Sequence, residues 1–199
     1  MDFLASAKDA ASCEATPHHL TLSAEDYPRL GTKMQMNPPV RGKDHREAIW
    51  RGLQAGVVDV LGSDHAPHTL EEKARPYPAS PSGMTGVQTL VPIMLDHVNA
   101  GRLTLARFVD LTSAGPQRLF GIIGKGRIAA GYDADFTIVD MKRSETIRDP
   151  WIASRSRWTP YDGRTVTGWP VGTIIRGRRV MWEREIVGPP AGEAVRFWG

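Results

Sequence analysis

The sequence predicts an α/β protein in which a parallel sheet is followed by a β-rich C-terminal module. The order strand, long loop, helix occurs twice in the first part of the chain, as in two consecutive βα units. The second strand, residues 57–61, is a largely apolar run of the kind found in parallel sheets covered on both faces. Beyond Gly121 the chain shifts to β-forming and turn residues, which predicts the module.

The first unit begins with a short strand at residues 12–15 and continues through a proline-interrupted loop at residues 16–41. Residues 44–55 are expected to form a helix, because Asp44 is a suitable N-cap and Gly56 stands just beyond the last turn. The loop therefore lies between strand and helix, where βα units carry their reactive groups.

The second unit contains the strand at residues 57–61 and an irregular loop at residues 66–86 that holds four prolines. Helical spacing follows at residues 87–99 and 104–111, with a short further helix at residues 116–120. The chain thus repeats the strand, loop and helix order of the first unit.

We divide the chain into an α/β part, residues 1–120, and a β-rich tail, residues 121–199. A strand is expected at residues 136–139, after a glycine- and aspartate-rich turn. Residues 171–187 predict a hairpin with Gly177 near its turn.

Composition excludes several classes of function. The net charge is +3 with the basic residues spread along the chain, and the cluster at residues 176–179 lies among strand-like apolar residues, so nucleic-acid binding is not indicated. Cys13 is the one cysteine, which excludes an internal disulfide and fits a reducing cytosol. No apolar stretch approaches the roughly 20 residues needed to cross a bilayer. We therefore expect a cytoplasmic protein that does not act at membranes.

The segment LGSDHAPHTLEEK, residues 61–73, places chemistry directly after the second strand. Asp64 at the carboxyl end of a parallel strand is suited to bind a divalent metal and to accept a proton from metal-bound water. His68 could donate to a substrate oxygen, and His65 could support Asp64 from behind. The alternative is that Asp64 caps a turn and that both histidines face solvent.

A second polar loop, residues 35–41, precedes this segment. Two prolines stiffen the backbone after Asn37, so its amide could face the same mouth, although Asn-Pro is also common in plain turns. His18 and His19 are adjacent, and on a strand they would point to opposite faces, so at most one could face a site. We expect a structural role for this pair.

The segment GSDHAPHTLEEK resembles the strand-eight signature of dihydroorotases, which are metal-dependent hydrolases of the amidohydrolase superfamily. His68 after Ala66-Pro67 is more similar to dihydroorotases than to their allantoinase and dihydropyrimidinase relatives. Five further segments resemble the same family in the same order, so the resemblance covers nearly the whole chain. They are CEATPHHL, KMQMNPPVRGKDHREAI, PSGMTGVQT, GRIAAGYDADFTIVD and TPYDGRTVTGWPVGTIIRGRRV.

The resemblance implies the last two βα units of a (β/α)8 barrel and a small β-sandwich-like module. It also implies a centre of one or two zinc ions and the reversible hydrolysis of L-dihydroorotate, a small molecule, to N-carbamoyl-L-aspartate in pyrimidine synthesis. By the same resemblance Asp64 is the metal ligand and the general acid/base. Asn37 and His68 match substrate-contacting positions, and Ser82 and Gly83 match a loop whose backbone approaches the substrate ring.

The sequence also departs from the family pattern. It contains no His-x-His pair, and the family's mid-barrel lysine or aspartate and the ligand histidines of strands five and six are missing. A catalytic zinc needs about three protein ligands, and the chain supplies one matched ligand, Asp64. We therefore expect a C-terminal fragment that alone binds zinc weakly and does not hydrolyse dihydroorotate. Its open sheet edges predict association with further copies or with a complementing chain.

Two other functions stay open at this point. The chain could be a non-catalytic remnant or partner subunit, for example of aspartate transcarbamoylase. It could also belong to a related cyclic amidase that opens a hydantoin or dihydropyrimidine ring.

Overall fold

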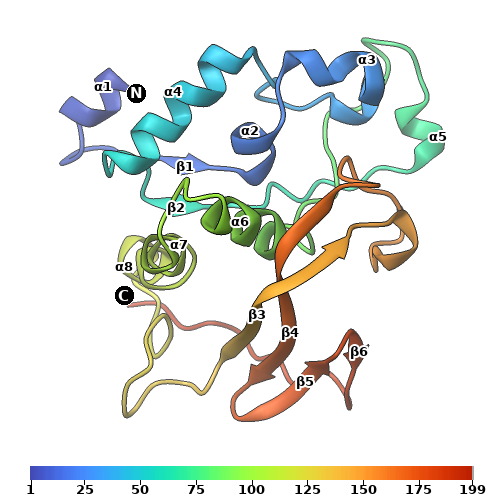
Figure 1. Ribbon diagram of the computed structural model, residues 1–199. Coiled ribbons are helices and arrows are strands. Elements are labelled where there is room, and N and C mark those ends of the chain that lie inside the picture. The colour runs from blue at the N-terminus through green and yellow to red at the C-terminus, as the bar shows by residue number, and fades with distance from the viewer. Residues whose placement is uncertain (199) are drawn as a thin grey trace.

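The computed structural model describes residues 1–198 and contains a parallel sheet and an antiparallel sheet. The parallel sheet is a pair of short strands near the centre of the molecule, and the four-stranded antiparallel sheet lies to one side of it (Figure 1). The parallel pair consists of β1 (Glu14–Ala15) and β2 (Val60–Leu61). The antiparallel sheet has the order β3 (Phe136–Thr146), β4 (Thr165–Ile175), β5 (Arg178–Trp182) and β6 (Glu185–Ile186).

Helices lie on both sides of the parallel pair in Figure 1. The longest, with 12 residues, is α4 (Lys43–Gln54), which follows β1. The other α-helices are α1 (Asp2–Ser6), α2 (Pro17–Thr21), α3 (Tyr27–Leu30), α5 (Leu70–Lys73), α6 (Leu90–Asn99), α7 (Leu105–Val109) and α8 (Gly115–Phe120). Short 3-10 turns occupy Ala24–Asp26, Gly31–Met34 and Asp149–Trp151, and a π-turn, Asp110–Ala114, joins α7 to α8. Within residues 1–198 none of the helices combines the length and the apolar character required to cross a bilayer.

The two expected strands are present in shortened form and pair in parallel, with Ala15 opposite Leu61. Backbone hydrogen bonds at both ends extend the pairing, among them Asp59 N to Cys13 O at 2.8 Å and Gly62 N to Ala15 O at 3.0 Å. Because the strands run in the same direction, the loops that follow them leave the sheet at the same edge. This edge is where any shared site must form.

Two details of the first unit differ from the sequence expectation. The segment after β1, expected to be a loop, forms α2, since Thr16 accepts a bond from the His19 backbone N–H and Pro17 has the backbone angle that suits a first helical turn. The N-cap of α4 is Gly42 rather than Asp44, which lies inside the first turn. A carboxylate there is still favourable, because the helix dipole is positive at this end.

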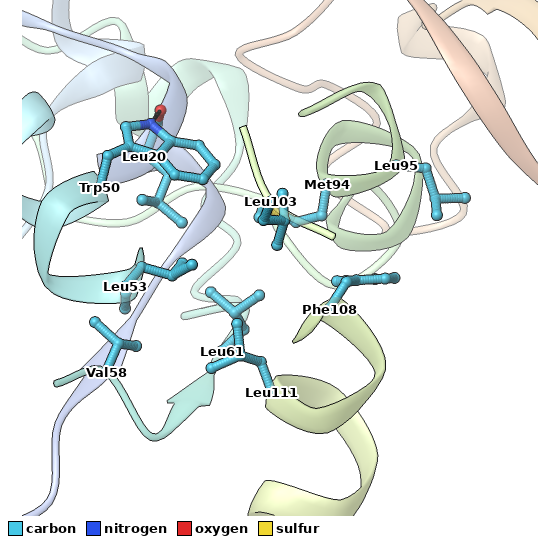
Figure 2. Packing of buried hydrophobic residues seen from close by; sticks show 11 residues of the cluster. Leu20, Trp50, Leu53, Val58, Leu61, Met94, Leu95, Leu103, Phe108 and Leu111 are labelled. Atoms are coloured by element: carbon cyan, nitrogen blue, oxygen red, sulfur yellow. Dashed lines mark hydrogen bonds between the residues drawn. The ribbon is translucent and has the colours of Figure 1, made fainter. Parts of the chain in front are cut away.

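One hydrophobic cluster holds the parallel pair between its helices. Figure 2 shows Trp50 and Leu53 of α4 near Leu61 of β2, with Met94 of α6 and Phe108 of α7 on the other side. The Trp50 ring is buried, and its Nε1 donates to the backbone oxygen of Leu20 at 2.8 Å, so the indole pays no penalty for an unpaired donor.

The antiparallel sheet is fixed directly to α6. Asp96 accepts a bond from Thr167 N at 3.0 Å, and Asn99 donates to Thr167 O at 2.7 Å. A Cβ at Gly168 would lie 2.6 Å from the Cβ of Leu95, so β4 approaches the helix as closely as glycine allows. The expected hairpin is present as β4 and β5, whereas the division at residue 120 into two domains stays a prediction.

His97 of α6 is a buried titratable group in the same region. Its side chain bonds Thr21 Oγ1 through Nε2 at 2.9 Å and makes an edge contact with the Trp50 ring. The pKa of His97 is lowered to about 4, mainly by burial and also by the nearby charge of Arg164, while Asp96 opposes the shift.

We therefore expect the free energy of unfolding to fall as the pH is lowered from 6.5 towards 4. In this window the unfolded chain binds a proton at His97 and the folded chain does not, which contributes up to about 1.4 kcal/mol per pH unit. Urea denaturation of wild type and His97→Gln between pH 7 and pH 4.5 measures this contribution, because glutamine does not titrate. Equal pH slopes for the two proteins would contradict it.

Candidate functional site

A cavity of about 620 Å³ lies where β1 and β2 end. Thr16 and His19 line it from the start of the first loop, Asn37 from the later part of that loop, and Asp64 from the loop after β2. Arg46 and its neighbours on α4 form another wall. The structure thus brings Asn37 and Asp64 to one mouth, although 27 positions separate them in the printed sequence.

Asp64 has an unusual backbone conformation. Its φ is +46°, in the left-handed region that L-residues other than Asn and Asp rarely adopt. The side chain is 40% exposed, and Oδ2 lies 3.8 Å from Nε2 of His18. A left-handed backbone conformation at a residue whose carboxylate lines a cavity is consistent with a functional site.

His18 and His19 form a hydrogen-bonded group under this mouth. Thr16 Oγ1 lies 3.1 Å from His18 Nε2 and 2.7 Å from His19 Nδ1, and His19 Nε2 lies 3.0 Å from the backbone oxygen of Pro38. Both ring nitrogens of His19 therefore have protein partners. A structural role was expected for this pair, with at most one ring facing a site, and His19 is the one that lines the cavity. The Thr-Pro-His-His pattern that starts a helix was the signal for its position.

The electrostatics of this group follow from burial. Burial lowers the pKa of His18 to about 3, and the neighbouring His19 adds to the shift. Burial also lowers the pKa of His19, while the Pro38 carbonyl and the charge of Asp64 act in the opposite direction. His18 is consequently neutral at pH 7, and its contact with Asp64 is no ion pair there.

Glu14 is a second carboxylate in the lining, which the sequence interpretation did not single out. It is the first residue of β1, and a Cβ at Gly62 would lie 2.3 Å from its carboxylate, so a larger residue at position 62 would displace the end of this side chain. Its place two residues before Thr16, near the carboxyl end of the strand expected at residues 12–15, was the signal available in the sequence.

His68, Ser82 and Gly83 form a separate group that is not part of the cavity lining. His68 Nε2 lies 3.1 Å from the Ser82 backbone oxygen, and its Nδ1 lies 3.4 Å from Glu72 Oε2. Gly83 N donates to the Gln35 backbone oxygen at 2.9 Å. This bond joins the second loop to the first loop at Gln35, which is two residues before Asn37.

His65 faces a different part of the molecule from the one expected. Its Nδ1 accepts from the backbone N–H groups of Gly86 and Val87, at 3.1 Å and 3.4 Å. Among the described residues His65 makes no hydrogen bond to Asp64, so it does not support that carboxylate as expected. The ring instead fixes the segment that enters α6, a long-range contact that its position in the sequence could not indicate.

The described residues do not make a complete metal centre. Within residues 1–198 no three side chains of His, Cys, Asp or Glu are grouped so that they could hold a metal ion. His18 and His19 direct their ring nitrogens at protein partners, and a catalytic zinc requires about three protein ligands. Asp64 can supply one of them.

Gly83 shows how tightly the second loop is packed. Its φ is +135°, and a Cβ there would lie 2.4 Å from the backbone oxygen of Ala66 and 2.9 Å from its Cβ. Side chains other than hydrogen are excluded by both the backbone angle and the space.

We therefore expect Gly83→Ala to lower the free energy of unfolding by about 1–3 kcal/mol more than Gly101→Ala does. Gly101 also has a positive φ, +73°, but no atom lies within 4 Å of its Cβ position, so it serves as a positive-φ glycine without the close contact. Urea denaturation of both variants measures the difference, and equal losses would show that the contact with Ala66 is not formed.

Comparison with known proteins places this geometry in context. The profile described as "Amidohydrolase family" matches residues 2–180. A dihydroorotase of Pyrococcus furiosus is 46% identical over 184 residues, which cover 92% of this chain and 42% of that protein. A dihydroorotase of Halobacterium salinarum is 43% identical over 96% of this chain and 45% of that protein.

Solved structures agree with the fold. The L-hydantoinase (dihydropyrimidinase) of Arthrobacter aurescens superposes with a TM-score of 0.90 at 33% identity, over 94% of this chain and 43% of that one. A structure of a D-hydantoinase gives a TM-score of 0.88 at 30% identity, over 94% and 43% of the two chains. The chain spans less than half the length of these relatives.

Proposed function

The chain belongs to the amidohydrolase family, and we propose that it carries one side of a dihydroorotase active site. The observation that carries the proposal is that Asn37 and Asp64, from loops after two successive parallel strands, line a single cavity. The identity of 46% to a dihydroorotase supports this reaction over that of the hydantoinases, whose solved structures are 33% identical or less among those compared.

The match to the amidohydrolase family and the similar solved structures support the proposal, because both indicate an α/β fold of the TIM-barrel type. We infer that β1 with its helices and β2 with its helices are the last two βα units of a (β/α)8 barrel. The antiparallel sheet of β3 to β6 then corresponds to the small sandwich-like module. The parallel register of β1 and β2 supports this assignment, because barrel strands pair in this way.

The reaction opens a cyclic amide. The oxygen of water bonds to the ring carbonyl carbon of L-dihydroorotate, the C–N bond of that amide breaks, and N-carbamoyl-L-aspartate is released. The proton lost by the water must reach the released nitrogen. Asp64 is the group that we assign to accept and return it, since its half-exposed carboxylate faces the cavity.

The remaining residues bind and orient the substrate in this proposal. The amide of Asn37, next to two prolines in the wall of the cavity, is suited to donate to the ring carbonyl or carboxylate. His68 would donate to the substrate carboxylate after releasing the Ser82 oxygen that it now contacts. The backbone at Ser82 and Gly83 would approach the ring, which the missing side chain of Gly83 permits.

Enzymes of this family are generally metal-dependent, and zinc is the metal that the resemblance implies. The residues described here do not form its site alone, and Asp64 is the single ligand that we assign from this chain. The other ligands must then come from protein outside residues 1–198.

An assay of the joined enzyme tests the substrate. The chain is fused to the part of the Pyrococcus furiosus dihydroorotase that it does not cover, and hydrolysis of L-dihydroorotate, dihydrouracil and hydantoin is measured. We expect preference for L-dihydroorotate, because its carboxylate has partners in His68 and Asn37. Replacing His68 by Ala should lower kcat/KM for L-dihydroorotate by roughly 10- to 100-fold, as the loss of a hydrogen bond to a charged group does.

The two neutral rings provide the control for His68→Ala. They have no carboxylate, so their residual kcat/KM should change little in the variant. Preference for hydantoin or dihydrouracil would instead identify the chain with the related cyclic amidases. A folded fusion that hydrolyses none of the three compounds would support the non-catalytic alternative.

A further inference from the structure

Lys73 is a buried cation that the proposed chemistry does not use. It is the last residue of α5, and only 1% of its surface is exposed. Its Nζ donates to the backbone oxygen of Pro81 at 2.7 Å and to that of Gln35 at 3.3 Å. No carboxylate lies within salt-bridge distance of this ammonium group among the described residues, so its charge is met by peptide carbonyls.

The two carbonyls belong to the two loops that carry the proposed substrate contacts. Gln35 is two residues before Asn37, and Pro81 directly precedes Ser82. The Gln35 backbone oxygen accepts from Gly83 N at 2.9 Å, and the Gln35 side chain donates to Ser80 O at 2.7 Å. Lys73 thus stands where the first loop meets the second.

The backbone of Lys73 is tied to the same junction. Its oxygen accepts from the hydroxyls of Thr32 and Ser80, one on each side of the contact. The capping box of Thr69 and Glu72 fixes the single helical turn from which the side chain extends. The ammonium therefore extends from a capped helical turn and contacts two segments that do not pair with each other as strands.

The free energy of burying a charge makes lysine an unfavourable residue at this position. Burying a cation without a carboxylate is unfavourable, whereas methionine would fill a similar volume without that penalty. Burial lowers the pKa of Lys73 to about 8, so the ammonium form still prevails at neutral pH. An ammonium offers three donors from one atom, which an apolar side chain cannot replace.

We propose that Lys73 is a positioning residue, whose ammonium group fastens the loop of Asn37 to the loop of Ser82 and Gly83 beside the cavity. That these loops contact substrate rests on the proposed function. The fastening itself is a property of this chain and can be measured without substrate.

A spectroscopic measurement on the wild-type chain tests the contact directly. In 15N-resolved NMR spectra of the lysine side chains, an ammonium held by two buried carbonyls exchanges its hydrogens slowly and gives a visible signal. We expect one such signal from Lys73, while Lys43, which is exposed, exchanges rapidly. Exchange of the Lys73 hydrogens as fast as those of Lys43 would overturn the proposal, whether or not any variant folds.

A matched pair of variants tests the consequence. In Lys73→Met the amide of Gly83, which donates to Gln35, should exchange with deuterium about tenfold faster than in wild type. The amide of Gly62, which donates to Ala15 between β1 and β2, should stay within about twofold, because a general loss of stability would affect both amides. Lys33→Met is the control. Lys33 lies in the same loop as Gln35, but its Nζ lies over the Trp158 ring, 5.8 Å from the ring centre. The control therefore removes a lysine charge from this loop without removing the Lys73 contact.

The outcomes separate the two proposals. Faster exchange at Gly83 alone in Lys73→Met, with Lys33→Met unchanged, supports the positioning role even if the fused enzyme hydrolyses no dihydroorotate. Wild-type exchange at Gly83, or equal acceleration at Gly83 and Gly62, would overturn that role even if the fused enzyme is active.

Discussion

The parallel pairing of β1 with β2 is the constraint on which the rest of the structure depends. The pair is short, and its register is defined by Ala15 opposite Leu61 and by the hydrogen bonds at either end. This register sends the two long loops out at one edge, where Asn37 and Asp64 line a common cavity. A register shift would turn buried side chains such as Leu61 away from the core, so the hydrophobic cluster and the site require the same pairing.

The antiparallel sheet region takes part in building the site. Trp158 is fully buried, and its Nε1 donates to the His68 backbone oxygen at 2.7 Å. The backbone oxygen of Trp158 accepts from the Thr85 hydroxyl at 2.7 Å. Trp158 belongs to a cluster that also contains Met36 of the first loop and Met84 of the second. The segment between β3 and β4 therefore holds the loop of His68 in place through Trp158. Lys73 completes this support on the side of Gln35.

The sequence predicted those features that depend on local pattern. The apolar run before Asp64, the helical spacing around Trp50 and the turn at Gly177 all gave the observed type of element. The sequence could not predict the orientation of the His65 ring or the burial of Lys73. Both depend on partners that are distant in the sequence and that only folding brings into contact. The loop expected at His18 and His19 was wrong, because Thr16 and Pro17 start a helix there.

The central claim is that Asp64 transfers the proton in ring opening, and one rate measurement tests it most directly. In the enzyme formed by fusion to the part of the Pyrococcus furiosus dihydroorotase that this chain does not cover, Asp64→Asn removes the proton acceptor with little change in shape. Asp9→Asn makes the same chemical change at an exposed residue before β1 that is not part of the cavity lining. The account predicts a loss in kcat for L-dihydroorotate of about 100-fold or more in Asp64→Asn and none in Asp9→Asn. Equal kcat values for two folded variants would contradict it.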